Sequence, residues 1–452
     1  MNYIIKNATL VNEGDTTLAS VVISDGKIAK ILPGKDARPC VSTNYDVIDA
    51  EGLYLIPGII DEHVHFREPG LTQKADIFTE SRAAVAGGVT SFMDMPNTVP
   101  QTTTIDLLRQ KFDLAAEKSL ANYSFYLGAT NDNIDEIKRL DPKKVCGVKL
   151  FMGSSTGNML VSENDALVRL FNEAPCLIAA HCEDEQIIHA NTVCCKDLAS
   201  KGEVVPDAGV HPFVRTTEAC YKSTAKAVDM AAKFGARLHV MHISTKSELT
   251  LFRNDIQLAD KKITAETCPH YLTFCDKDYE TKSFAIKCNP AIKMASDRDV
   301  LRHAIIDGHI DTIGSDHAPH LWHEKFTDDY FTSKSGFPSI QNNLDIMLNL
   351  YHQGVISLTQ IVRLMCHNPA TLYRIKGRGF IREGYYADLV LVDLNHNKTI
   401  KNDDMLYKCG WTPYDGMQAH SQVTHTFVNG CLVYHDGIVE NSINSKALEF
   451  DR

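Results

Sequence analysis

The chain lacks the features by which membrane proteins and nucleic-acid-binding proteins are recognised. None of its apolar stretches approaches the roughly 18 to 20 residues that a membrane-spanning helix needs. It contains no run of lysines or arginines, and its formal net charge is −11 over 452 residues. Because polyanions are bound by concentrated cationic faces, this charge balance disfavours nucleic acid. We therefore expect neither a membrane nor a nucleic acid among its partners.

Signs of a disulfide framework or of export are also missing. The thirteen cysteines are odd in number, form no Cys-x-x-Cys pair, and in cases such as Cys176 and Cys182 lie in apolar runs. Reduced and mostly buried thiols fit this pattern better than disulfides. From Met1 to Leu10 the apolar residues are scattered among Asn and Lys, unlike the continuous apolar block of a signal peptide. We expect a cytoplasmic protein.

Short β-like runs mark both ends of the chain. Near the N-terminus they cover residues 3–5, 20–23 and 27–31, and Asp25-Gly26 supplies a hairpin-type turn. The same pattern of short β-like runs returns in residues 387–392, 424–430 and 431–434. We expect the two ends to pair into one small β domain, made of residues 1–53 and 377–452.

Between these ends, residues 54–376 alternate strand-like and helix-like segments. The candidate strands are residues 55–65, 89–97, 123–130, 147–152, 176–181, 237–243, 262–267 and 310–316. Helical candidates such as 76–86 and 217–233 lie in the gaps. This order is typical of a parallel α/β fold, and eight such units favour a closed (β/α)8 barrel. The pattern alone leaves a doubly wound sheet open.

Two histidines at the end of the first candidate strand are the most informative feature. His63 and His65 are two residues apart, a spacing that in a strand points both imidazoles to the same face. In a barrel, side chains at this end of a strand face the mouth, where active sites are built. Turn residues follow directly. The pattern favours a metal site over two unrelated polar residues at a strand end.

Later strands also end in side chains that can bind a metal. His181 and His242 each close an apolar run, and Asp316 closes the last candidate strand. Asp316 could ligate a metal or move a proton, although Asp also commonly caps helices and loops. His239 lies three residues before His242, so a regular strand turns it to the opposite face, and we expect it to have a packing role.

Lys149 lies inside an apolar run that should be buried in the fourth strand. A lone buried ammonium is costly. One solution is a deprotonated amine that carries CO2 as a carbamate, whose two oxygens can bridge two divalent cations. The other is a lysine whose long side chain reaches solvent at a strand edge, and the sequence leaves both open. With the histidines and Asp316, a carbamate could complete a two-zinc site whose activated water hydrolyses amides.

The ordered set of these residues resembles the amidohydrolase superfamily and, within it, the group of dihydroorotases, hydantoinases and allantoinases. The resemblance covers nearly the whole chain and implies a distorted (β/α)8 barrel with a small β domain from both chain ends. It also implies the role of each ligand. His63 and His65 would bind the more buried zinc, His181 and His242 the more exposed one, carboxylated Lys149 would bridge them, and Asp316 would ligate and act as the base.

The same resemblance implies a substrate that carries a carboxylate. Arg67 follows the histidine pair by two residues, and an arginine fork suits a carboxylate. In dihydroorotases, positions that match Arg67, Asn97 and His320 hold the substrate carboxylate, which hydantoin and allantoin lack. Asn289 matches a further substrate contact. We therefore expect a dihydroorotase, which interconverts L-dihydroorotate and N-carbamoyl-L-aspartate in pyrimidine biosynthesis.

Two alternatives stay open. The chain could be a hydantoinase- or allantoinase-like enzyme, or a non-catalytic scaffold with the same fold, although scaffolds tend to lose ligands. Zinc itself is implied by the resemblance only, since histidine and carboxylate ligands also accept manganese, cobalt or iron. We further expect a homodimer acting on a small-molecule substrate.

Overall fold

Eight parallel strands form the centre of the protein in the computed structural model, which describes residues 2–35, 45–153 and 159–452. In sequence order, and each beside the next, they are β6 (Ile59–Val64), β7 (Val89–Asp94), β8 (Asn122–Gly128), β9 (Gly147–Phe151), β10 (Ile178–His181), β11 (Leu238–Val240), β12 (Ile263–Thr267) and β13 (Thr312–Ile313). A parallel bridge from Val64 to His317 joins the first strand to the segment after the last. The predicted barrel is confirmed, and the doubly wound alternative is wrong.

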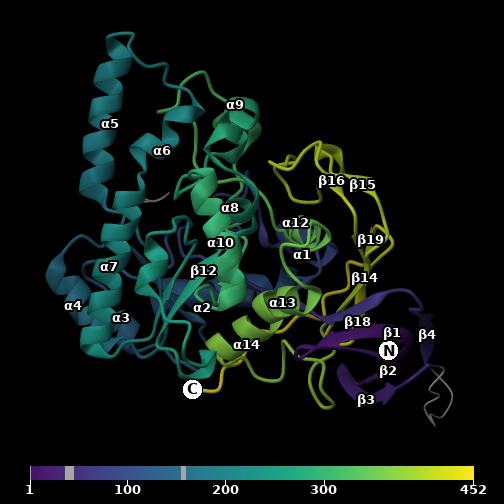
Figure 1. The fold of residues 1–452 in the computed structure, drawn as a ribbon. Coiled ribbons are helices and arrows are strands. Elements are labelled where there is room, and N and C mark those ends of the chain that lie inside the picture. The colour runs from purple at the N-terminus through teal and green to yellow at the C-terminus, as the bar shows by residue number, and fades with distance from the viewer. Residues whose placement is uncertain (1, 36–44, 154–158) are drawn as a thin grey trace.

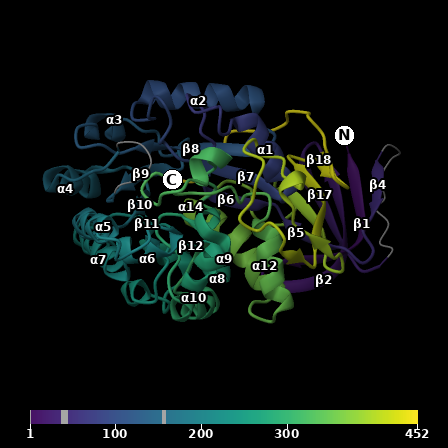
Figure 2. The ribbon, with the colours of Figure 1, turned by 90° about the horizontal axis from the view of Figure 1, so that it is seen from above.

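Helices surround this barrel, as the view from above shows (Figure 2). They are α1 (Ile77–Ala86), α2 (Ile105–Lys118), α3 (Ile134–Lys138), α4 (Asn164–Glu173), α5 (Glu185–Ser200), α6 (His211–Val214), α7 (Thr217–Phe234), α8 (Pro269–Thr273), α9 (Tyr279–Lys282), α10 (Ala295–Asp307), α11 (Trp322–Lys325), α12 (Asn343–His352), α13 (Leu358–Val362) and α14 (Asn368–Tyr373). The sequence predicted α1 and α7 closely because both carry end signals. Asp76 accepts a hydrogen bond from Thr79 N at 2.9 Å, and Gly235 ends α7 in the left-handed conformation.

A second sheet, built from both ends of the chain, lies beside the barrel, with purple N-terminal and yellow C-terminal strands together (Figure 1). Its strands are β1 (Tyr3–Asn12), β2 (Asp15–Ser24), β3 (Lys27–Pro33), β4 (Asp46–Asp49), β5 (Tyr54–Pro57), β14 (Leu389–Asp393), β17 (Gln422–Val428), β18 (Cys431–His435) and β19 (Ile438–Val439). Strands β15 (Lys398–Thr399) and β16 (Gln418–Ala419) form a separate pair. The predicted pairing of the chain ends is confirmed. The domain bounds at 53/54 and 376/377 stay a prediction.

One predicted strand is wrong as a single element. Residues 55–65 divide at Gly58, so that β5 pairs with β1 and β14 in the end sheet while β6 opens the barrel. A Cβ on Gly58 would lie 2.1 Å from Thr90 Oγ1, so the chain passes from one sheet to the other where only glycine fits. Apolar residues on both sides of this junction hide it from sequence reasoning.

Alternation along the barrel strands separates an outer core from the barrel interior. In β9, Val148 and Leu150 join the large core beneath the helices, while Lys149 between them faces inward. Interior side chains such as Met93, Tyr126 and Met241 fill the barrel below. The open space therefore lies at the carboxyl ends of the strands.

The structure bears on the state of the cysteines and on membrane-spanning helices. The twelve cysteines there are all free thiols, as the sequence predicted. No helix among those residues combines the length and the apolar character that crossing a bilayer requires.

Asp388, which directly precedes β14, joins the end sheet to the barrel. It is buried, pairs with Arg378, and accepts hydrogen bonds from Asn122 Nδ2 at 3.2 Å and from Asn429 N at 2.7 Å. Asn122 begins the barrel strand β8. Because a buried ion pair that loses one partner leaves an uncompensated charge, this contact should matter to stability.

We predict that Asp388→Ala lowers the free energy of unfolding by about 3–5 kcal/mol, because it leaves Arg378 buried and unpaired. The matched control is Asp197→Ala, which removes an exposed ion pair with Lys201 and should cost no more than about 0.5 kcal/mol. Denaturant unfolding of both variants checks this. Equal losses in the two variants would contradict the proposed link between sheet and barrel.

Candidate active site

One pocket at the carboxyl ends of the barrel strands contains nearly all of the predicted site residues. It is lined by His63, His65, Arg67, Asn97, Lys149, Phe151, His181, His242, Asn289, Asp316, Ala318, Ser335 and Gly336. All predicted metal ligands are present. Of the predicted substrate contacts, only His320 is not part of the lining. It lies behind Arg67, with its Nε2 atom 3.4 Å from Arg67 Nη2.

His63, His65 and Asp316 converge on one point. Asp316 Oδ1 lies 3.2 Å from the Nε2 atoms of both histidines. Burial lowers the pKa of His65 to about 3, so its imidazole is neutral and offers a lone pair. Burial raises the pKa of Asp316, but the imidazoles of His63 and His65 outweigh it and hold that pKa far below its usual range. A neutral imidazole and an ionised carboxylate are the forms that bind a metal.

His181 and His242 form a second pair across the pocket. His181 Nδ1 lies 2.9 Å from His242 Nε2, and burial lowers the pKa of both side chains. His242 follows β11 with a positive φ of 43°, which breaks the regular alternation. Consequently the prediction that His239 faces the opposite side is wrong. Its imidazole lies inside the barrel, 2.9 Å from Thr264 Oγ1, and its packing role is retained.

Lys149 is buried in the pocket wall without a counter-charge. Its Nζ contacts Met241 Sδ at 2.9 Å, and no carboxylate lies within ion-pair distance in the described part of the chain. Burial lowers its pKa to about 8. The alternative in which this side chain reaches solvent is therefore wrong. An amine that is easily deprotonated and faces a metal-ligand set is suited to carbamate formation.

These observations test whether divalent metal ions fit the site, and they do. The histidine pairs supply nitrogen donors, Asp316 supplies an anionic oxygen, and Lys149 has no carboxylate within ion-pair distance among the described residues. Nitrogen and carboxylate donors of this kind bind first-row divalent metals.

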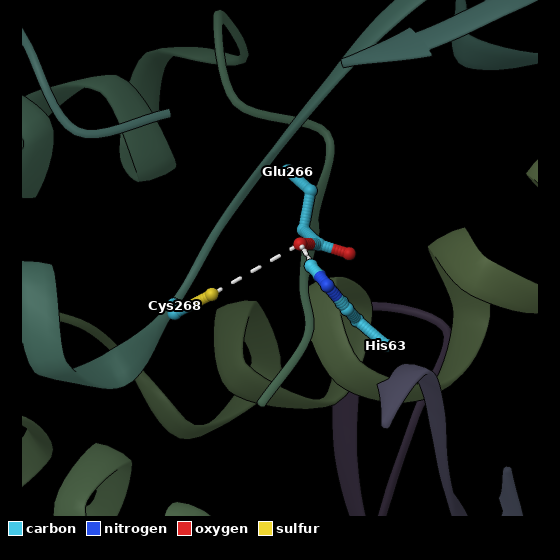
Figure 3. Close-up of side chains that lie close together, drawn as sticks. All are labelled: His63, Glu266 and Cys268. Atoms are coloured by element: carbon cyan, nitrogen blue, oxygen red, sulfur yellow. Dashed lines mark hydrogen bonds and ion pairs between the residues drawn. The ribbon is translucent and has the colours of Figure 1, made fainter. Parts of the chain in front are cut away.

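Two carboxylates that the sequence reasoning missed orient His63. Glu266 Oε1 lies 2.7 Å from His63 Nδ1 and accepts a hydrogen bond from His242 N at 3.1 Å. Figure 3 shows His63 and Cys268 approaching this same carboxylate from different sides. Asp61 Oδ1 accepts hydrogen bonds from the backbone N–H groups of His63 and Ser315. Glu266 lies inside a strand that the sequence predicts to be buried. A carboxylate at such a position was the signal that could have identified this residue.

The predicted substrate contacts differ in their surroundings. Asn97 Oδ1 lies 2.7 Å from His65 Nδ1, so Asn97 orients a metal ligand as well as lining the pocket. Asn289 Oδ1 is buried with no hydrogen-bond partner among the described residues. Arg67 is buried, and burial lowers its pKa to about 10. No carboxylate lies within 4 Å of its guanidinium in the described ranges.

A parallel barrel with buried imidazoles, a carboxylate and a buried lysine at its mouth is typical of a metal-dependent hydrolase. Comparison with known proteins gives the family. Residues 54–433 match the model of the amidohydrolase family, and the chain belongs to that family.

Its relatives share nearly its whole length. A dihydroorotase of Methanosarcina acetivorans is 34% identical, over 98% of this chain and 93% of the relative. An allantoinase of Bacillus velezensis is 31% identical, over 96% of this chain and 94% of the relative. Among solved structures, the L-hydantoinase of Arthrobacter aurescens superposes with a TM-score of 0.90 at 28% identity, covering 97% of each chain. The resemblance to the dihydroorotase, hydantoinase and allantoinase group is confirmed.

We predict that Glu266→Gln weakens divalent-metal binding about 10- to 100-fold, because His63 loses the anionic partner that fixes its ring. Glu248→Gln is the matched control. Glu248 is also buried, but its carboxylate binds Thr224 and Thr245 away from the pocket. Competition with a chelator measures both affinities. Unchanged zinc affinity in Glu266→Gln would show that this carboxylate does not support the metal ligand.

Proposed function

We propose that the protein is a dihydroorotase, which hydrolyses L-dihydroorotate to N-carbamoyl-L-aspartate and closes the ring in the reverse direction. Hydrolysis of a cyclic amide is the activity common to its relatives. The choice among cyclic amides depends on one observation, the buried guanidinium of Arg67 in the pocket wall.

The Arg67 guanidinium has no carboxylate within ion-pair distance among the described residues. Its Nε donates to Pro319 O at 3.2 Å, and its Nη2 lies 3.4 Å from His320 Nε2. Since a guanidinium cannot lose its charge at neutral pH, its burial favours an anionic ligand. The carboxylate of dihydroorotate would supply that charge in a bidentate pair. Hydantoin and allantoin have no carboxylate.

The rest of the pocket can recognise the ring. Asn289 Oδ1 could accept a hydrogen bond from a ring N–H, which would satisfy this buried oxygen. Asn97 and His320 flank the metal ligands and Arg67 respectively, and we assign both to the carboxylate end of the substrate.

We assign the metal ligands as two groups. His63 and His65 would hold one zinc, and His181 and His242 would hold a second. Lys149, carboxylated by CO2, would bridge the two ions, and Asp316 would be a further ligand. Bound divalent cations supply polarisation of an amide carbonyl and a lowered pKa of water. The protein orients the imidazoles, through Glu266 for His63 and Asn97 for His65.

We assign the proton transfer to Asp316. Its carboxylate is ionised and lies among the imidazoles that surround the reacting centre. It would take a proton from the attacking water and deliver it to the leaving ring nitrogen. In ring closure the same carboxyl group would carry the proton in the reverse direction, from the ring-forming nitrogen to the departing water. A non-catalytic scaffold would not need this complete set of metal ligands and proton-transfer group. Association into a homodimer stays a prediction.

We predict that Arg67→Met lowers kcat/KM for dihydroorotate at least about 30-fold, because a buried charge-assisted pair is worth about 2–5 kcal/mol. The wild-type enzyme should turn over dihydroorotate well and hydantoin or allantoin poorly. Steady-state assays with all three cyclic amides check both statements. Preferred turnover of hydantoin or allantoin by the wild type, unaffected by Arg67→Met, would instead identify the protein as a relative of that kind.

We predict that Asp316→Asn lowers turnover in both directions by about 10²- to 10⁴-fold, because the amide cannot accept the proton. Metal content must be measured in parallel, since Asp316 is also assigned as a ligand. Loss of turnover at normal metal content supports the role of base. Substantial residual turnover in either direction would contradict it.

A further inference from the structure

Two loop segments that are joined by buried lysines form part of the pocket wall. Ser335 and Gly336 line the pocket on one segment, and Asn289 lines it on the other. Gly336 has a φ of 114°, and a Cβ there would lie 2.8 Å from Ala318 O. The first segment therefore passes close over the chain after β13, and its path depends on glycine.

Lys325, at the end of α11, connects these two segments. Its side chain is completely buried, and Nζ donates to Lys287 O at 2.5 Å, Gly336 O at 2.8 Å and Lys334 O at 3.0 Å. Three acceptors use all three N–H donors of an ammonium group. Lys287 O, two residues before Asn289, also accepts from Gly336 N at 2.9 Å.

Lys287 also joins the two segments, in the opposite direction from Lys325. Its buried Nζ donates to Tyr330 O and Ser333 O, both at 2.6 Å. Neither lysine has a carboxylate within ion-pair distance in the described part of the chain. Burial lowers the pKa of both amines, that of Lys287 to about 7, and Lys287 Nζ also lies 4.1 Å from the centre of the Tyr330 ring. Burying two amines whose hydrogen-bond acceptors are backbone carbonyls is an expensive way to gain stability, since an apolar side chain avoids the desolvation cost. Their use beside the pocket indicates that the path of this wall matters.

We propose that Lys325 is a positioning residue, whose ammonium holds the Ser335–Gly336 wall against the Asn289 segment so that the substrate meets a preformed pocket. The inference deepens the proposed function, and it rests on that function only for the choice of assay substrate. Preformed walls lower the ordering cost of binding, so the loss of this contact should raise KM. The metal ligands do not touch Lys325, and metal content should stay unchanged.

The test uses the full-length, metal-loaded Lys325→Met variant, whose side chain has similar length but no donor. We expect KM for dihydroorotate to rise at least about tenfold, with a smaller change in kcat. Hydrogen exchange of the peptide that covers residues 327–337 should become at least about tenfold faster. This second readout needs no substrate, so it still tests the positioning role if dihydroorotate proves to be the wrong substrate.

Lys261→Met is the matched control. Lys261 is also buried, but its ammonium binds Asp311 Oδ1 and Gly308 O at the amino ends of β12 and β13, away from the pocket. This variant should lose stability and keep the wild-type KM and loop exchange. Equal increases of KM in both variants, or wild-type KM and exchange in Lys325→Met, would overturn the proposal. Should Lys325→Met fail to fold, Lys287→Met tests the same wall through Tyr330 and Ser333, with the same expected result.

Discussion

The constraint on which the site depends is the burial of polar groups whose charge or hydrogen-bonding capacity the described residues leave incompletely matched. At the barrel mouth Lys149 and Arg67 have no carboxylate within ion-pair distance among the described residues, and Asn289 Oδ1 has no donor there. Each such group costs free energy until something binds it. Metal ions and an anionic cyclic amide would satisfy all of them together, which links the binding of both to one pocket.

The barrel and most of the ligand set could be predicted from the sequence because they depend on local patterns. Alternation places Lys149 inward, and apolar strands that stop at His181, or at His63 and His65, mark the barrel mouth. Glu266 could not be assigned, because its contact with His63 joins residues 203 positions apart. The positive φ of His242 likewise reverses an expectation about His239 that strand periodicity gave.

The pocket residues are held by supporting side chains, two of which lie outside the pocket. These two are Glu266, which orients His63, and Lys325, which joins two loop segments of the wall, while Asn97 orients His65 from within the lining. Rings and loops fixed in this way do not have to be ordered when substrate binds. Such supporting residues are hard to find from the sequence because they carry no motif of their own.

The central claim is that the barrel mouth binds two divalent cations. The most direct test is anomalous diffraction at the zinc edge from crystals grown with zinc and bicarbonate. We expect two peaks in the pocket, one beside His63 and His65 and one beside His181 and His242, with Lys149 between them. An absence of anomalous density in the pocket under these conditions would contradict the account.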